Sequence, residues 1–217
     1  MKDKKYFAHE TAVIDEGCTI GEGTKIWHFS HICAGAVIGK SCSLGQNVLV
    51  ADSAYLGNNV KVQNNVAIYG GVTVENDVFL GPSCVLTNVS NPRSQVTRKS
   101  LYEKTLIKRG ATIGANATIV CGITLGGYCF VGAGSVVTKD IPDYGLVLGN
   151  PGKLSGYMSR HGHKLTFNES GRATCPESKF VYEKIEYQVR CLDLGEDDPL
   201  PSELSFGSKY YDSFKNR

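Results

Sequence analysis

The stretch LVADSAYLGNNVKVQNNVAIYGG, residues 49–71, places an aliphatic residue at every sixth position. Val50, Leu56, Val62 and Ile68 share one phase, and mostly small or amide residues lie between them. Neither the 3.6-residue period of an α-helix nor the two-residue alternation of a β-strand gives a strict period of six over this length. The stretch therefore predicts a repeat protein.

The same phase extends in both directions. Thirteen consecutive sixth positions from Ile14 to Leu86 are aliphatic, the phase then slips, and six more follow from Ile107 to Val137. The pattern predicts an all-β solenoid, in which each hexad forms one short strand and a tight corner and three hexads close a triangular coil. The aliphatic residues then stack inside the prism. These nineteen hexads correspond to about six coils, a prism about 30 Å tall at about 4.8 Å between paired strands.

Composition argues against several classes of protein. The chain has 217 residues with 23 basic and 21 acidic side chains, so its charge does not indicate a nucleic-acid partner. No apolar run approaches the roughly 18 residues of a membrane span, and the N-terminal residues lack the apolar segment of a secretory signal. The eight cysteines form no CxxC pair. We expect reduced, mostly buried thiols in a cytoplasmic protein rather than a disulfide framework.

The interruption NVSNPRSQVTRKSLYEKTL, residues 88–106, is the most informative break in the repeat. It is polar and carries four basic residues, Arg93, Arg98, Lys99 and Lys104. Loops that project from a rigid scaffold often hold binding residues, although a solvated insertion would have the same composition. We expect a β-helical domain over residues 1–150 with this inserted loop. A C-terminal cap, with a short helix or turn at 154–166, and an irregular tail are expected over residues 151–217.

Four further stretches carry a resemblance to a known family. They are IWHFSHI (26–32), GPSCVLTNVSNPRS (81–94), IKRGATIGANATIVCGITLGGYCFVGAGSVVTKDIPDYGLVLGNPGK (107–153) and GYMSRHGHKL (156–165). The chain resembles the bacterial UDP-2-acetamido-3-amino-2,3-dideoxy-glucuronate N-acetyltransferases, of the hexapeptide-repeat acyltransferase superfamily, over roughly residues 6–180.

The resemblance implies a left-handed parallel β-helix that acetylates the 3-amino group of that UDP-linked sugar, with acetyl-CoA as co-substrate. Such a cytoplasmic enzyme serves the synthesis of surface polysaccharide, the lipopolysaccharide O-antigen. The resemblance also implies a homotrimer with active sites between subunits. Two alternatives stay open: an N- or O-acetyltransferase of another nucleotide-linked sugar, and a non-catalytic β-solenoid that binds a ligand.

Asn88 matches the asparagine that the family places beside the reacting centre. An amide does not titrate, so we expect Asn88 to orient the amine or to bind the carbonyl oxygen. Arg93 is the candidate for the acceptor's carboxylate or phosphates, because a guanidinium can pair with either bidentately; a loop-stabilising ion pair is the alternative. Gln63, Asn64 and Tyr69 are candidates for lining the sugar pocket.

His28 and His31 are the histidines of the repeat. His31 is a candidate general base and His28 a candidate substrate ligand, since a neutral imidazole suits either task; surface or interface histidines are the alternative. A zinc site of three histidines from adjoining coils has no third histidine there, so we expect no metal.

The C-terminal hexads are the expected binding surface for coenzyme A. Small residues that would let a pantetheine arm lie along the prism are Ala115, Ala117, Ala133 and Gly134. Basic residues suited to the phosphates of coenzyme A are Lys139, Lys153 and Arg160. The plain alternative is that tight corners simply require small residues. Association of the prisms is expected from apolar residues assigned to outward positions, namely Val48, Tyr55, Ala67, Tyr69, Phe79 and Tyr128.

Overall fold

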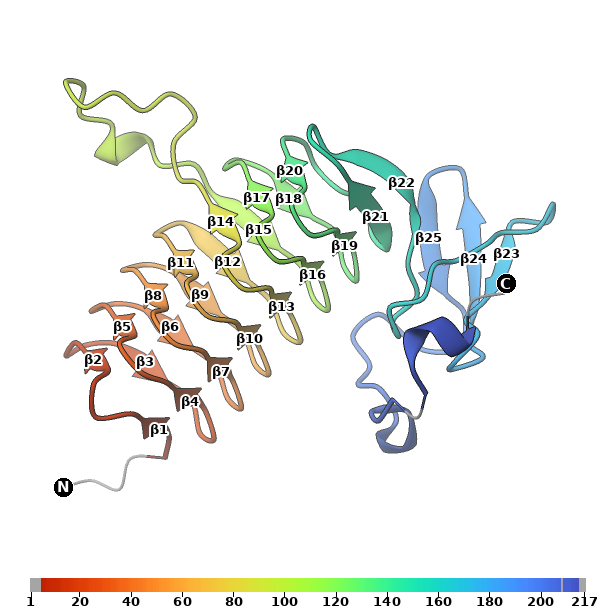
Figure 1. Cartoon of the computed structure of the whole chain (residues 1–217), viewed down its shortest axis with the longest axis horizontal. Helices are drawn as coiled ribbons and strands as arrows, with labels where there is room; N and C mark the ends of the chain where they lie inside the picture. Colours follow the sequence, from red (N-terminus) through yellow and green to blue (C-terminus); the bar gives the residue numbers. More distant parts are fainter. Residues whose placement is uncertain (1–4, 208, 215–217) are drawn as a thin grey trace.

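Each hexad forms a strand of two or three residues, and three strands make one coil of a triangular prism (Figure 1). The structure is a computed structural model that describes residues 5–207 and 209–214. Equivalent strands of successive coils pair in parallel, as Val62 of β10 (Lys61–Val62) pairs with Leu44 of β7 (Ser43–Leu44). The predicted all-β solenoid is confirmed.

The strands fall on three faces of the prism. The first face holds β1 (Phe7–Ala8), β4 (Lys25–Ile26), β7, β10, β13 (Phe79–Leu80), β16 (Thr112–Ile113), β19 (Phe130–Val131) and β21 (Gly145–Leu148). The second face holds β2 (Val13–Ile14), β5 (His31–Ile32), β8 (Leu49–Val50), β11 (Ala67–Ile68), β14 (Val85–Leu86), β17 (Thr118–Ile119) and β20 (Val136–Val137). The third face holds β3 (Thr19–Ile20), β6 (Val37–Ile38), β9 (Tyr55–Leu56), β12 (Val72–Val74), β15 (Thr105–Ile107) and β18 (Thr124–Leu125).

The prism has eight coils, numbered here from the N-terminus, rather than the six expected. The count is eight because β1 precedes the first counted hexad, a bridge from Ile141 to Leu125 completes coil 7, and β21 alone represents coil 8. Coil 5 contains β13, β14 and β15, so the inserted loop interrupts that coil. Seven spacings of about 4.8 Å between the eight strands of the first face make the prism about 34 Å tall.

The corners explain why small and amide residues recur in the sequence. A Cβ atom built on Gly39 would lie 2.5 Å from the carbonyl oxygen of Gly57 in the next coil, so only glycine fits there. Asn65 has a φ of 62°, a left-handed conformation that asparagine tolerates better than most residues. Asparagine side chains also tie the corners together, since Oδ1 of Asn64 accepts the backbone N–H of Gln46 at 2.8 Å.

The core is built from two inward positions per hexad. All nineteen aliphatic residues of the repeat are buried in it or packed against it. The residue two positions before each is also inward, because side chains alternate across an extended segment. Val48 is one of these and is 1 % exposed, so its expected outward position is wrong. Tyr55 does lie outward and is 47 % exposed. Six of the eight cysteines are buried, as expected.

The inserted loop leaves the prism between β14 on the second face and β15 on the third. It projects well away from the coils and contains one short 3-10 helix, η1 (Lys99–Leu101) (Figure 1). The loop ends earlier than the expected residue 106, because Thr105 already pairs with Val72.

The C-terminal part is more regular than expected. Residues expected to form a helix or turn begin instead within β22 (Lys153–Tyr157), which pairs antiparallel with β21. The segments β23 (Arg172–Thr174), β24 (Val181–Ile185) and β25 (Gln188–Cys191) form an antiparallel sheet over a second core that includes Tyr144 and Tyr182. An irregular tail is therefore wrong for residues 181–191.

Two short 3-10 helices follow this sheet, η2 (Ser202–Leu204) and η3 (Tyr211–Phe214). Residues 1–4, 208 and 215–217, which the expected domain and tail include, lie outside the described residues. Among the described residues, no helix has the length and apolar character needed to cross a membrane.

Candidate active site

Asn88 lies where the inserted loop leaves coil 5, at the edge that joins the second and third faces of the prism, called here the 2–3 edge. It follows β14 after one residue, Thr87, and is half-buried. Its main-chain carbonyl oxygen accepts the N–H of Glu103 at 2.9 Å, which closes the foot of the loop. Its side-chain amide makes no hydrogen bond with any described residue. The amide is therefore held at a fixed point of the prism and is available to a ligand.

Glu103 forms a latch at the foot of the loop, together with Ser90 and Cys121. One carboxylate oxygen, Oε1, accepts the Ser90 hydroxyl at 2.5 Å and the Ser90 N–H at 3.2 Å. The thiol of Cys121, in coil 6, donates to the same oxygen at 3.6 Å. The hydrogen bond from the Ser90 hydroxyl is the main reason that the pKa of Glu103 is lowered. Sequence reasoning missed this latch, although Glu103 and Cys121 are 18 residues apart, the length of one coil; Ser90 lies in the inserted loop, outside that spacing.

Three of the four basic residues of the loop, Arg93, Arg98 and Lys99, line a hollow of about 400 Å³ together with Tyr102 and other loop residues. Arg93 is exposed, and its guanidinium donates only to the carbonyl oxygen of the adjacent Pro92, at 3.1 Å. It has no acidic partner among the described residues, so the alternative of a loop-stabilising ion pair is not observed. Arg98 does brace the loop, through a 3.0 Å hydrogen bond from Nε to the carbonyl oxygen of Asn91.

The expected sugar-pocket residues divide between two edges. Tyr69 follows β11 at the 2–3 edge, one coil before Asn88, so these two residues lie on the same edge of adjacent coils. Gln63 and Asn64 follow β10 at the corner that joins the first and second faces, called here the 1–2 edge. Asn64 is already engaged in the corner ladder with Gln46. Within one chain, Gln63 and Asn64 do not join Asn88.

The small residues expected to receive the pantetheine arm lie on the 1–2 edge of coils 6 and 7. The N–H of Gly134 donates to the carbonyl oxygen of Ala115 at 2.8 Å, and Ala133 and Gly134 are exposed. No atom lies within 4 Å of a Cβ built on Gly134, so this surface is open. Ala117 does not belong to it. Its side chain is fully buried in the core, and its expected contact with coenzyme A is wrong.

The three expected phosphate ligands have different surroundings. Lys139 and Lys153 are exposed and form no ion pair with a described residue. Lys153 opens β22, and the neighbouring Gly152 binds Val136 of the second face at 2.7 Å. Arg160 is engaged elsewhere. It lies 4.4 Å over the Tyr128 ring and donates to the carbonyl oxygens of Gly195 and Asp198 at 3.0 and 2.7 Å, which fastens the C-terminal segment.

The two histidines of the repeat lie at different places on the prism, and neither is close to Asn88. The ring of His28 lies at the 1–2 edge and stacks on His9 with 3.6 Å between ring centroids, and its buried Nδ1 has no partner among the described residues. His31 lies in coil 2, whereas Asn88 lies in coil 5. Three coil spacings separate them by about 14 Å along the axis. Asn88 and His31 of one chain therefore cannot contact the same amine.

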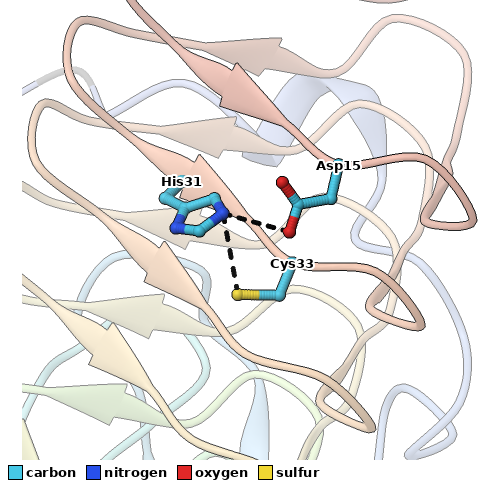
Figure 2. A group of neighbouring side chains, drawn as sticks. All are labelled: Asp15, His31 and Cys33. Carbon is cyan, nitrogen blue, oxygen red and sulfur yellow. Dashed lines mark hydrogen bonds and ion pairs between the residues drawn. The ribbon is translucent and has the colours of Figure 1, made fainter.

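His31 has two close neighbours that sequence reasoning did not consider (Figure 2). Its Nε2 lies 3.1 Å from Oδ2 of Asp15 and 4.0 Å from Sγ of Cys33. All three residues are half-buried, and their donor atoms lie within 4.8 Å of one another. Burial and then the charge of Asp15 raise the pKa of the Cys33 thiol. The expectation of no metal did not consider this carboxylate and this thiol; the 18-residue coil length, which stacks Asp15 beneath Cys33, was the signal that would have found this group.

Comparison with known proteins identifies the family. The description "Bacterial transferase hexapeptide (six repeats)" matches residues 17–52 and 53–88, and "Hexapeptide repeat of succinyl-transferase" matches residues 107–139. The chain is 46% identical over 169 residues to the dTDP-3-amino-3,6-dideoxy-alpha-D-galactopyranose 3-N-acetyltransferase of Aneurinibacillus thermoaerophilus, an alignment that covers 78% of this chain and 86% of that relative.

Solved structures with similar folds are more distant in sequence. One is the acetyltransferase domain of PglB from Neisseria gonorrhoeae in complex with acetyl coenzyme A, with 23% identity, a TM-score of 0.45 and coverage of 69% of this chain and 57% of that one. Another is an N-acyltransferase from Bacillus cereus, AntD, in complex with dTDP and coenzyme A, with 17% identity, a TM-score of 0.46 and coverage of 72% and 83%.

The family matches agree with the coils described above. The fold is the left-handed parallel β-helix of the hexapeptide-repeat proteins. The family descriptions cover both blocks of hexads on either side of the inserted loop. The chain belongs to the hexapeptide-repeat acetyltransferase family.

Proposed function

We propose that this enzyme transfers an acetyl group from acetyl-CoA to the 3-amino group of a nucleotide-linked amino sugar. The observation that carries the proposal is the 46% identity to a 3-N-acetyltransferase of a dTDP-linked 3-amino sugar, across 86% of that relative. The acceptor that we favour is UDP-2-acetamido-3-amino-2,3-dideoxy-glucuronate, as a cytoplasmic precursor of the lipopolysaccharide O-antigen. The second candidate is the dTDP-linked 3-amino sugar named for the relative.

Asn88 is the residue that we assign to the reacting amine. Acetyl-CoA supplies a thioester, whose sulfur is a good leaving group, so the protein mainly has to place the amine correctly. The Asn88 amide oxygen accepts a hydrogen bond from one N–H group of the neutral amine. This hydrogen bond directs the nitrogen lone pair at the acetyl carbonyl carbon. The new C–N bond forms as the C–S bond breaks, and the proton from nitrogen passes to the departing sulfur.

His31 takes no part in this scheme. It lies about 14 Å from Asn88 along the prism axis, and a three-fold ring of parallel prisms would keep each residue at its own height. A base at His31 would therefore not reach the amine from the same chain or from a neighbour. Proton transfer to the sulfur of the co-substrate needs no protein base. In agreement with this, no titratable side chain among the described residues binds the Asn88 amide.

Arg93 is the residue that we assign to the acceptor's negative charge. It is exposed beside a loop hollow, with no carboxylate to neutralise it among the described residues. A planar guanidinium binds a carboxylate through two parallel hydrogen bonds. A uronate would use this fork, whereas a 6-deoxy sugar offers only its nucleotide phosphates. This difference is our reason for favouring the glucuronate acceptor.

The two halves of the proposed site lie on different edges of one prism. Asn88 and its loop lie on the 2–3 edge of coil 5, and the open small-residue surface at Ala115, Ala133 and Gly134 lies on the 1–2 edge of coils 6 and 7. The whole second face separates them. A homotrimer of about 70 kDa, three chains of 23.5 kDa, would set the 2–3 edge of one chain against the 1–2 edge of the next through a heterologous interface.

The test is release of the coenzyme A thiol by purified enzyme with acetyl-CoA and a panel of nucleotide amino sugars. The panel contains UDP-2-acetamido-3-amino-2,3-dideoxy-glucuronate, its uncharged glucose analogue, and the dTDP-linked 3-amino-3,6-dideoxygalactose. We expect the highest kcat/KM with the glucuronate. A preference for the dTDP sugar selects the second candidate. Turnover with none of the three 3-amino sugars refutes the proposed function.

A further inference from the structure

We propose that Asp15, His31 and Cys33 form a binding site for one zinc-type divalent cation, separate from the acetyl-transfer site. The group combines one carboxylate, one imidazole and one thiol from coils 1 and 2 (Figure 2). The three donor atoms lie close together at the 2–3 edge. The site is about three coil spacings, or about 14 Å, from Asn88.

The donor atoms already have nearly the spacing that a tetrahedral zinc ion requires. Zinc binds nitrogen and carboxylate oxygen at about 2.0–2.2 Å and sulfur at about 2.3 Å, so bound N and O atoms are about 3.4 Å apart and bound N and S atoms about 3.5 Å apart. The corresponding separations here are 3.1 Å between His31 and Asp15 and 4.0 Å between His31 and Cys33. The donor atoms of Asp15 and Cys33 lie within 4.8 Å of one another, against about 3.6 Å for O and S atoms bound to one zinc ion, so rotations of the Asp15 and Cys33 side chains would complete the geometry.

The backbone holds the three side chains in place. Asp15 N–H donates to the carbonyl oxygen of Ile32 and Cys33 N–H donates to that of Val50, both at 2.9 Å, so the two corners are stacked in register. The Ala34 N–H donates to Oδ2 of Asp15 at 3.3 Å and orients the carboxylate. Hydrogen bonds of this kind behind a ligand are what orient it in established metal sites.

The donor set selects the metal. Thiolate and imidazole favour zinc over magnesium or calcium, which prefer oxygen ligands. Three protein ligands leave one tetrahedral position for water or another ligand. Binding converts the Cys33 thiol to a thiolate and releases one proton.

The cation would stabilise the open N-terminal end of the prism. The inward residues Ile14 and Ile20 of coil 1 are only partly buried, whereas Ile26 and Ile32 of coil 2 are fully buried. A metal held by Asp15 of coil 1 and by His31 and Cys33 of coil 2 would fasten the less buried coil to the more buried one. Any ligand that binds only the folded chain raises its stability by mass action.

The experiment compares metal-free wild type with Cys33→Ser and with Cys18→Ser as a matched control. Cys18 is another half-buried cysteine at the N-terminal end, outside the donor group. Cobalt(II) is the optical probe, because a cobalt-bound thiolate gives a charge-transfer band in the near ultraviolet. Titration with zinc, followed by calorimetry and by Tm, measures affinity and stabilisation. Circular dichroism verifies that each variant is folded.

We expect the cobalt band, binding of one zinc per chain and a zinc-dependent rise in Tm for wild type and for Cys18→Ser. Cys33→Ser should lose the band and bind zinc more than about 10-fold more weakly, since loss of a ligand should cost at least as much as loss of a residue behind it. Asp15→Asn should keep the band but bind zinc more weakly. A wild type without the band, or a Cys33→Ser variant with an unchanged band and affinity, overturns the proposal. None of these readouts depends on the acceptor sugar, so they stand apart from the proposed function.

Discussion

The N–H of Glu103 donates a 2.9 Å hydrogen bond to the carbonyl oxygen of Asn88, so the inserted loop begins and ends at the same point of the prism. The carboxylate of Glu103 also binds both the hydroxyl and the N–H of Ser90. The residue assigned to the amine is therefore fixed from its main-chain side, while its side chain stays available. Four predictions about catalysis rest on this arrangement.

Replacement of Asn88 by alanine should reduce kcat by about 100-fold or more, the loss typical of one preorganised hydrogen bond at a reacting centre. The fold should be intact, because the Asn88 amide has no partner among the described residues. Asn76→Ala is the matched control. It removes an asparagine of the corner ladder at the edge between the third and first faces, whose Oδ1 accepts the N–H of Asn58, and should lower Tm with little effect on kcat. Steady-state kinetics and thermal melts of both variants are the measurements, and near-normal turnover by Asn88→Ala would remove this residue from the mechanism.

The latch at Glu103 should make the loop sensitive to acid. The pKa of Glu103 is lowered, chiefly by the Ser90 hydroxyl. A carboxylate with a lowered pKa contributes its full stabilisation above the ordinary glutamate pKa of about 4.3, and this contribution is lost as the pH falls through the lowered value.

Glu103→Gln should therefore raise the KM for the acceptor at neutral pH, with a smaller effect on acetyl-CoA, and should remove the change in loop protection between neutral pH and about pH 3. Hydrogen exchange of residues 88–104 at several pH values measures this. Equal protection of wild type and variant across that range would show that the latch does not hold the loop.

Arg93→Lys should raise the KM for the acceptor by about 10-fold or more, because a lysine supplies a point charge in place of the planar fork. The KM for acetyl-CoA should not change. Arg190→Lys is the control, since Arg190 pairs with Glu183 in the C-terminal sheet and should leave both KM values unchanged. Equal losses for both substrates in Arg93→Lys would indicate a structural role for the loop arginine.

Much of this fold was predictable from the spacing of aliphatic residues. The inward positions predicted for the aliphatic residues from Ile14 to Val137 are confirmed, because a hexad repeat determines which side chain faces the prism axis. Val48 was assigned wrongly because each hexad has a second inward position, which strand alternation reveals and the six-residue period does not. The C-terminal sheet of β23, β24 and β25 lies outside the repeat, and its pairing depends on contacts such as that of Tyr144 with Tyr182, at 5.5 Å between ring centroids.

The site was predictable only in part. Asn88 was predicted from its match to the family's motif and Arg93 from the loop that interrupts the repeat, and both stay predictions. The 18-residue coil length stacks Asp15 on Cys33 and Glu103 on Cys121, but it does not show the side-chain conformations that add His31 to the one group and Ser90 to the other. The engagement of Arg160 with Gly195 and Asp198 was equally hidden, since a sequence does not show which cation the C-terminal segment will cover.

The most direct test of the account uses two inactive variants in one assembly. Asn88→Ala removes the amine ligand from the 2–3 edge, and Ala133→Trp blocks the open 1–2 edge. If each site takes one edge from each of two chains, a 1:1 mixture, unfolded and refolded together, contains sites with both edges intact. By random assortment in a heterologous ring these are about one quarter of all sites.

We predict that each variant alone is inactive and that the refolded mixture recovers about one quarter of the wild-type kcat, while the two variants combined in one chain recover nothing. Coenzyme A thiol release is the assay, sedimentation equilibrium confirms that the mixture is trimeric, and native mass spectrometry identifies the mixed trimers. Mixed trimers that stay as inactive as the separate variants would contradict a site completed by two chains.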